Sequence, residues 1–202
     1  MGAQTFAADR QFRSTLWLVV SLNLAYFGIE FAVALAIGSV SLFADSVDFL
    51  EDMALNGLVL AALQLSPLAR AKLGMGLAGL LLLPACAMLI TLVRKFAVPL
   101  PPAALPLALT GLGALAVNSA SALLLARVRN RAGSLTKAAF LSARNDAFAN
   151  LAIIAAAGVT ALWPSIWPDI VVGLGIAALN ADAAREVWVA ARREHRAARD
   201  SG

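Results

Sequence analysis

The sequence predicts an all-α integral membrane protein with six transmembrane helices. Of its 202 residues, 61% are hydrophobic and only 14% are charged, and the mean hydropathy is +0.81. A soluble domain of this size needs a more polar surface than this composition allows. The apolar residues also form six runs of about the length that crosses a bilayer core. These runs cover residues 14–37, 40–63, 73–93, 103–126, 138–162 and 170–190.

Helix-breaking residues separate the runs and predict the connections between them. Gly38 and Ser39 predict a tight turn between the first two helices, and Pro67 closes the second helix. Prolines interrupt the chain again at 99–102 and at 163–168. The second of these segments also holds two tryptophans, which suit a membrane interface.

The charges outside the runs predict the orientation. An even number of spans puts both termini on one side, which then carries thirteen Lys and Arg residues against two, Arg94 and Lys95, on the other. Because positively charged loops stay in the cytoplasm, we expect cytoplasmic termini and a multi-pass protein of the inner (plasma) membrane. The expected parts are a cytoplasmic segment at 1–13, a six-helix transmembrane domain at 14–190 and a basic cytoplasmic tail at 191–202. No soluble part is large enough for nucleic acid binding.

Four acids interrupt the second apolar run. Asp45, Asp48 and Asp52 fall within about 60° of one another on a helix, whereas Glu51 lies to one side. An uncompensated charge at membrane depth costs at least about 2.5 kcal/mol, and ionisable residues within spans mark ion pathways. The counter-charge that this row of carboxylates predicts is a bound cation.

The fifth run carries a second polar face. Ser142, Asn145 and Asp146 share a sector of about 100° on that helix. Asp52 and Asp146 differ in expected depth by only about 5 Å, so they can share one site with Asp48. These three carboxylates, together with Ser142, Asn145, a backbone carbonyl or water, would supply about four to six ligands for a divalent metal ion.

Two acids keep alternative interpretations. Asp45 lies one turn from the expected site and is either an exit-path ligand or a stabiliser of the helix N-terminus. Glu30 is the acid within the first apolar run and is either a packing residue or a carboxylate on the path of the cation or proton. More broadly, intramembrane acids can serve only as interhelical hydrogen-bond partners. Three acids that converge at one depth favour the metal site over that alternative.

The chain resembles the cation diffusion facilitator family of divalent-metal/proton exchangers. The similarity is carried by four stretches, residues 23–30, 38–52, 144–150 and 168–173. In that family, a His or Asp followed four residues later by an Asp occurs on both the second and the fifth helix, and these four residues form the transport site. Asp48 and Asp52 match the first pair. Asp146 matches the acid of the second pair, whose partner position holds Ser142.

This resemblance implies metal export in exchange for protons by alternating access, with no enzymatic activity and no resident cofactor. It makes Zn²⁺ the default cargo and Cd²⁺ a close second. Oxygen ligands without histidine also suit Mn²⁺, Fe²⁺ and Co²⁺. The expected partners are thus divalent metal ions, protons and the lipid bilayer. The chain looks like a short member without the usual C-terminal cytoplasmic domain. The resemblance therefore does not decide whether the protein forms a homodimer.

The competing class is a membrane enzyme. Asp45, Asp48 and Asp52 have the spacing of the first magnesium-diphosphate motif of intramembrane prenyltransferases. Such an enzyme needs a second acidic motif, for which Asp182 and Glu186 are the candidates. Spacing alone is weak support, so the transporter is the favoured prediction.

Overall fold

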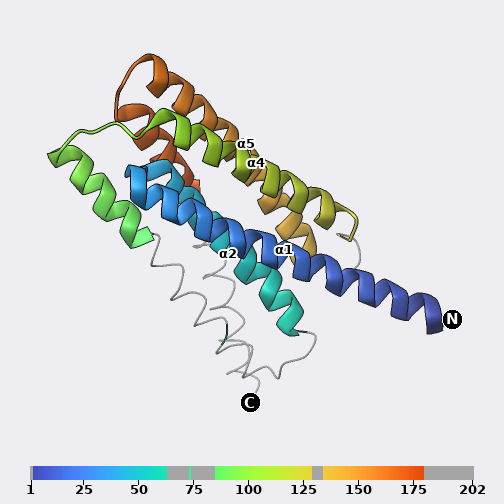
Figure 1. Ribbon diagram of the computed structural model, residues 1–202. Coiled ribbons are helices and arrows are strands. Elements are labelled where there is room, and N and C mark those ends of the chain that lie inside the picture. Colours follow the sequence, from blue (N-terminus) through green and yellow to red (C-terminus); the bar gives the residue numbers. More distant parts are fainter. Residues whose placement is uncertain (1, 63–72, 74–84, 129–133, 180–202) are drawn as a thin grey trace.

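A computed structural model describes residues 2–62, 73, 85–128 and 134–179, and every regular element in them is a helix (Figure 1). The all-α class and the six helices are confirmed within this part of the chain. Residues 74–84 of the third expected helix, 180–190 of the sixth and the tail at 191–202 lie outside the described residues. The described helices are α1 (Gly2–Ile37), α2 (Val40–Ala62), one over residues 85–97, α4 (Ala104–Ala126), α5 (Ser134–Leu162) and one over Trp167–Leu179.

The described helix ends agree with the expected runs to within a few residues, except at the start of α1. This helix begins at Gly2 instead of Ser14, so residues 2–13 of the expected N-terminal segment continue the first helix. No proline or glycine interrupts residues 3–13, and the polar residues there propagate a helix readily. The 36 residues of α1 are about 54 Å long. Figure 1 accordingly shows α1 extending past the other helices at its N-terminal end.

The turn between α1 and α2 has the conformation that Gly38 predicts. Gly38 has φ +62°, the left-handed region in which glycine carries no Cβ penalty. The Ser39 N–H bonds to the Ala34 carbonyl at 3.1 Å, as in a Schellman motif. Val40 then starts α2 directly, so α1 and α2 become close antiparallel neighbours.

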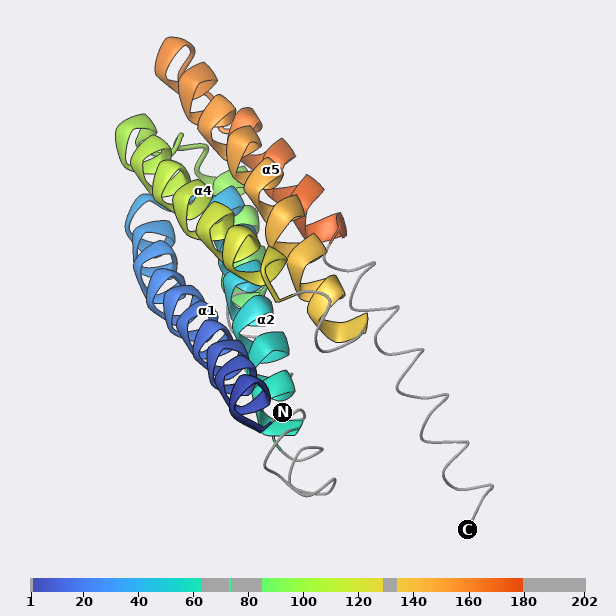
Figure 2. The same ribbon diagram turned by 90° about the vertical axis from the view of Figure 1, so that its right-hand side faces the viewer.

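The four long helices form a bundle in which each packs mainly on two of the others (Figure 2). α1 packs on α2 and α4, and α5 packs on α4 and α2. Two glycines of α4 allow close approach: a Cβ at Gly111 would lie 3.1 Å from the Ile153 side chain, and one at Gly113 would collide with the Tyr26 hydroxyl. That hydroxyl donates to the Thr110 carbonyl at 2.6 Å and ties α1 to α4.

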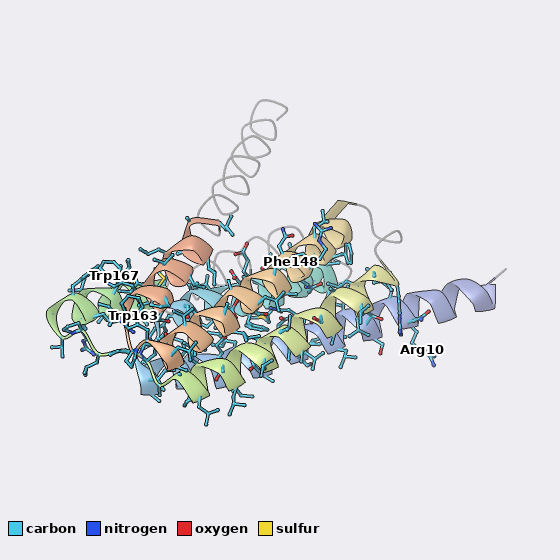
Figure 3. The ribbon with its side chains drawn as sticks, turned by 90° about the horizontal axis from the view of Figure 1, so that it is seen from above. Arg10, Phe148, Trp163 and Trp167 are labelled. Atoms are coloured by element: carbon cyan, nitrogen blue, oxygen red, sulfur yellow. The ribbon has the colours of Figure 1, made fainter. Side chains whose placement is uncertain are left out.

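The surface of the bundle suits a bilayer. Three helical segments are long and apolar enough to cross a membrane: Arg10–Ile37, Ala104–Ala126 and Ala139–Leu162. Trp163 and Trp167 are exposed at the end of the molecule that also holds Gly38, far from Arg10 (Figure 3). We call this the Gly38 end, formed by the α1–α2 turn, residues 98–103 and residues 163–166.

Candidate metal site

Three of the four acids of α2 lie on the buried side of that helix. Asp45, Asp48 and Asp52 are 0%, 6% and 1% exposed, whereas Glu51 is half-buried to one side. The stripe that helical spacing predicts is therefore the inner face of α2. No charged side chain of this kind stays inside a protein without compensation, so the neighbours of these carboxylates decide what the face can do.

Asp146 of α5 joins the acids of α2. It interacts electrostatically with both Asp48 and Asp52, and Ser142 lies beside both Asp52 and Asp146. Because α2 packs directly on α5, the predicted convergence of these two helices is realised. Four of the six candidate residues thus come together, namely Asp48, Asp52, Asp146 and Ser142, and Asp45 also interacts electrostatically with Asp48 and Asp146.

Several oxygens in this group have nothing to bond. Both carboxylate oxygens of Asp52 and the Oδ2 atom of Asp146 are buried and have no hydrogen-bond partner. Within the described residues, the salt bridge joins Lys95 to Asp169, and none reaches these acids. Buried carboxylate oxygens without donors are expensive to maintain. They are also the donor atoms that divalent cations accept.

The carboxylates are neighbours and do not form a closed coordination shell. In the ranges that the structure describes, no group of three His, Cys, Asp or Glu residues is close enough together to hold a metal ion. Like charges repel one another, so a compact arrangement of three carboxylates needs a cation among them. The fit to a divalent cation rests on the chemistry of the donor set, which consists of three carboxylates and one hydroxyl.

The remaining two candidates differ in position, because Asn145 is at the surface whereas Asp45 is buried and interacts electrostatically with Asp48 and Asp146. Asn145 is exposed, and its Oδ1 accepts a hydrogen bond from Arg144 at 3.4 Å, so its side chain is at the surface. Asp45 is buried and its Oδ2 accepts a hydrogen bond from Asn150 Nδ2 at 2.6 Å. The Oδ1 atom of Asn150 in turn accepts one from Asn118 Nδ2 at 3.0 Å. Asp45 is therefore oriented by a relay of amides from α5 and α4.

Glu30 is a buried acid whose position the sequence pattern does not reveal. It is fully buried on α1, and neither of its carboxylate oxygens has a hydrogen-bond partner. It lies against Asp45 and interacts electrostatically with Asp48. The one available signal was a single acid in the middle of an apolar helix, which is rare without a function. The acids thus form a continuous series from α1 through α2 to α5.

A series of buried carboxylates in an all-helical membrane protein is typical of proteins that move cations or protons across the membrane. The family model described as the cation efflux transmembrane domain matches residues 16–194. The chain therefore belongs to the cation efflux family, also called the cation diffusion facilitators, whose members transport divalent metal cations. No curated protein gives a significant sequence match. Because the family consists of transporters, the prenyltransferase alternative is not supported.

Proposed function

We propose that this protein exports divalent transition-metal ions from the cytoplasm in exchange for protons, by alternating access. The observation that carries this proposal is the approach of Asp146 on α5 to Asp48 and Asp52 on α2, with buried carboxylate oxygens that lack donors. A dehydrated cation between the two helices would supply the missing positive charge. Because the group bridges two helices, a relative movement of α2 and α5 would change access to it.

The proposed ligands are Asp48, Asp52, Asp146 and the Ser142 hydroxyl, with a backbone carbonyl or water to complete the shell. Asp45 lies one turn closer to the Gly38 end and is proposed as the next carboxylate along the exit path. The Asn145 side chain would have to turn inward from the surface to take part in metal binding.

The proposed orientation places both termini in the cytoplasm and the Gly38 end on the outer side of the inner (plasma) membrane. The support is the ratio of thirteen to two in basic residues between the two sides. The exposed Trp163 and Trp167 at the Gly38 end are suited to a membrane interface. Cations would then leave past Asp45 toward that end.

A flux assay tests the function. Inverted vesicles that contain the protein should accumulate Zn²⁺, Cd²⁺, Mn²⁺, Fe²⁺ or Co²⁺, each added separately, and vesicles without it should not. We expect uptake of more than one of these ions, because oxygen donors accept them all and discriminate weakly. If the vesicles take up none of these ions, the proposed export function is wrong.

Ser142 should influence which metal is preferred. Ser142→His restores the ligand type common at this position in the family, and imidazole nitrogen suits zinc better than it suits manganese. We expect the preference for Zn²⁺ and Cd²⁺ over Mn²⁺ to rise by about tenfold, measured as competition during vesicle uptake. Asn145→His is the matched control, since it places the same side chain at an exposed position on the same helix. An identical metal ranking for Ser142→His and the unchanged protein would exclude Ser142 as a ligand.

A further inference from the structure

Asp169 makes a buried polar contact that joins three helices. It lies in the first turn of the last described helix and is fully buried. Its Oδ1 accepts hydrogen bonds from Ser39 Oγ at 2.6 Å, Ser41 Oγ at 2.7 Å and the Ser41 N–H at 3.1 Å. Its Oδ2 accepts one from the Val40 N–H at 2.8 Å and lies 2.9 Å from Lys95 Nζ in an ion pair. We call these five residues the Asp169 clasp.

The clasp supplies hydrogen-bond acceptors to the N–H groups at the N-terminus of α2. The first N–H groups of a helix have no partner within the helix and carry partial positive charge. Ser39 caps the Leu42 N–H at 3.2 Å in the usual local way. The N–H groups of Val40 and Ser41 instead bond to Asp169, which comes from a helix far along the chain. The start of α2 is thus held by a charge from outside its own segment.

Close packing reinforces this contact. Gly173 lies one helical turn after Asp169, and a Cβ at Gly173 would be 2.8 Å from the Ser41 nitrogen and from the Val40 carbonyl carbon. The backbone of the last described helix therefore rests directly on the first turn of α2. Any larger residue at 173 would push the two helices apart.

The clasp lies close to the acids that α2 carries. Asp45 is five residues from Val40, which is about 7.5 Å along the helix axis, and Asp48 and Asp52 follow on the same face. Because a helix transmits rotation along its length, the clasp fixes the direction in which these carboxylates point. A catalytic or binding group displaced by about 1 Å can lose about 100-fold in efficiency.

We propose that Asp169 is a positioning residue for transport, which holds the rotation and depth of the α2 carboxylates opposite Asp146. This inference rests on the proposed function and assigns no contact between Asp169 and the cargo. Lys95 supports the role by compensating the charge of Asp169 where water is excluded. A purely stabilising role would instead change only how much folded protein reaches the membrane.

The transport test uses Asp169→Asn, in which the amide keeps the size of the side chain but replaces one acceptor oxygen by a donor. We expect the metal KM to rise by about tenfold or more, with the maximal rate per inserted molecule changed by less than about threefold. Thr160→Val is the matched control: it removes a buried hydroxyl near the Gly38 end that has no partner, and should change neither quantity. An unchanged KM with less inserted protein would overturn the positioning role.

Two milder variants cover the case in which Asp169→Asn does not fold. Ser41→Ala removes one hydroxyl donor to Asp169, and Lys95→Met removes the cation while keeping most of the side-chain volume. Both should raise KM in the same direction and by less than Asp169→Asn. A wild-type KM in both variants would equally overturn the proposal.

A distance measurement tests positioning without any transport. Spin labels on Leu58→Cys of α2 and Phe148→Cys of α5, with the exposed Cys86 replaced by Ala, report the arrangement of the two helices. Asp169→Asn should shift or broaden the distance distribution, and Thr160→Val should leave it unchanged. An unaltered distribution in Asp169→Asn counts against the clasp, whereas lack of metal uptake by the unchanged protein counts against the proposed function alone.

Discussion

Asp52→Asn is expected to abolish metal transport while the protein still inserts into the membrane. The amide keeps the shape of the carboxylate but removes a charge that would offset the desolvation of the cation. Removing one partner of a buried charge pair costs about 3 to 5 kcal/mol, which corresponds to a loss of about 100-fold or more in metal affinity. Both oxygens of Asp52 are buried without a hydrogen-bond partner, so the amide would leave a bound cation with one charged ligand fewer. The measurement is metal uptake by inverted vesicles with matched amounts of protein.

Glu51→Gln provides the matched control for this prediction. It makes the same chemical change one residue away on α2, at a half-buried side chain that is outside the stripe but interacts electrostatically with Asp48, Asp52 and Asp146. We expect it to retain transport to within a few fold. Asp48→Asn and Asp146→Asn should behave like Asp52→Asn. Full transport by Asp52→Asn would eliminate the proposed site.

An acidic vesicle lumen is expected to drive metal uptake into inverted vesicles. Neighbouring carboxylates that are shielded from bulk water cannot all remain ionised without a cation, so the metal-free site should hold at least one proton. Metal binding then displaces that proton, which makes exchange possible at a single site. Each unit of pH gradient should change the equilibrium ratio of metal concentrations by about tenfold for every proton exchanged.

Collapse of the gradient with a proton ionophore is the control, and the stimulation should vanish with it. The metal should also produce the reverse effect: adding it outside the vesicles should release protons from the lumen at a rate that follows metal uptake. Metal flux that does not depend on the pH gradient would indicate a uniporter and would contradict the proposed exchange of metal for protons.

The bundle and much of the candidate site could be predicted because both depend on local patterns. Apolar runs bounded by Gly38 and by prolines locate the helices, and the 3.6-residue period places Asp48 and Asp52 on one face. The similar expected depths of Asp146 and Asp52 predict that α5 lies beside α2, and the two helices are in contact. The start of α1 was missed because charged residues end a hydrophobic run without ending a helix.

Contacts that join several helices could not be predicted in this way. Glu30 shares its helix face with Asn23 and Tyr26 but with no other acid, so only the packing of α1 against α2 brings it to Asp45. Asp169 likewise caps a helix more than a hundred residues away in sequence, and no spacing rule connects them. Asn145 and Asp146 are adjacent in sequence and fall within the same sector of about 100° on the helix. A sector of that width does not reveal that Asn145 faces the surface.

The turn at Gly38 also bears on how the chain enters a bilayer. α2 holds four acids in 23 residues, and each Asp near the centre of a helix adds about 2.5 to 3.5 kcal/mol to the free energy of membrane insertion. A segment of that kind partitions poorly by itself. The tight turn delivers it directly against α1, which is strongly apolar over Arg10–Ile37. Insertion of these acids is therefore a property of the α1–α2 hairpin, and a mutation that opens the turn would act during biogenesis before it could affect transport.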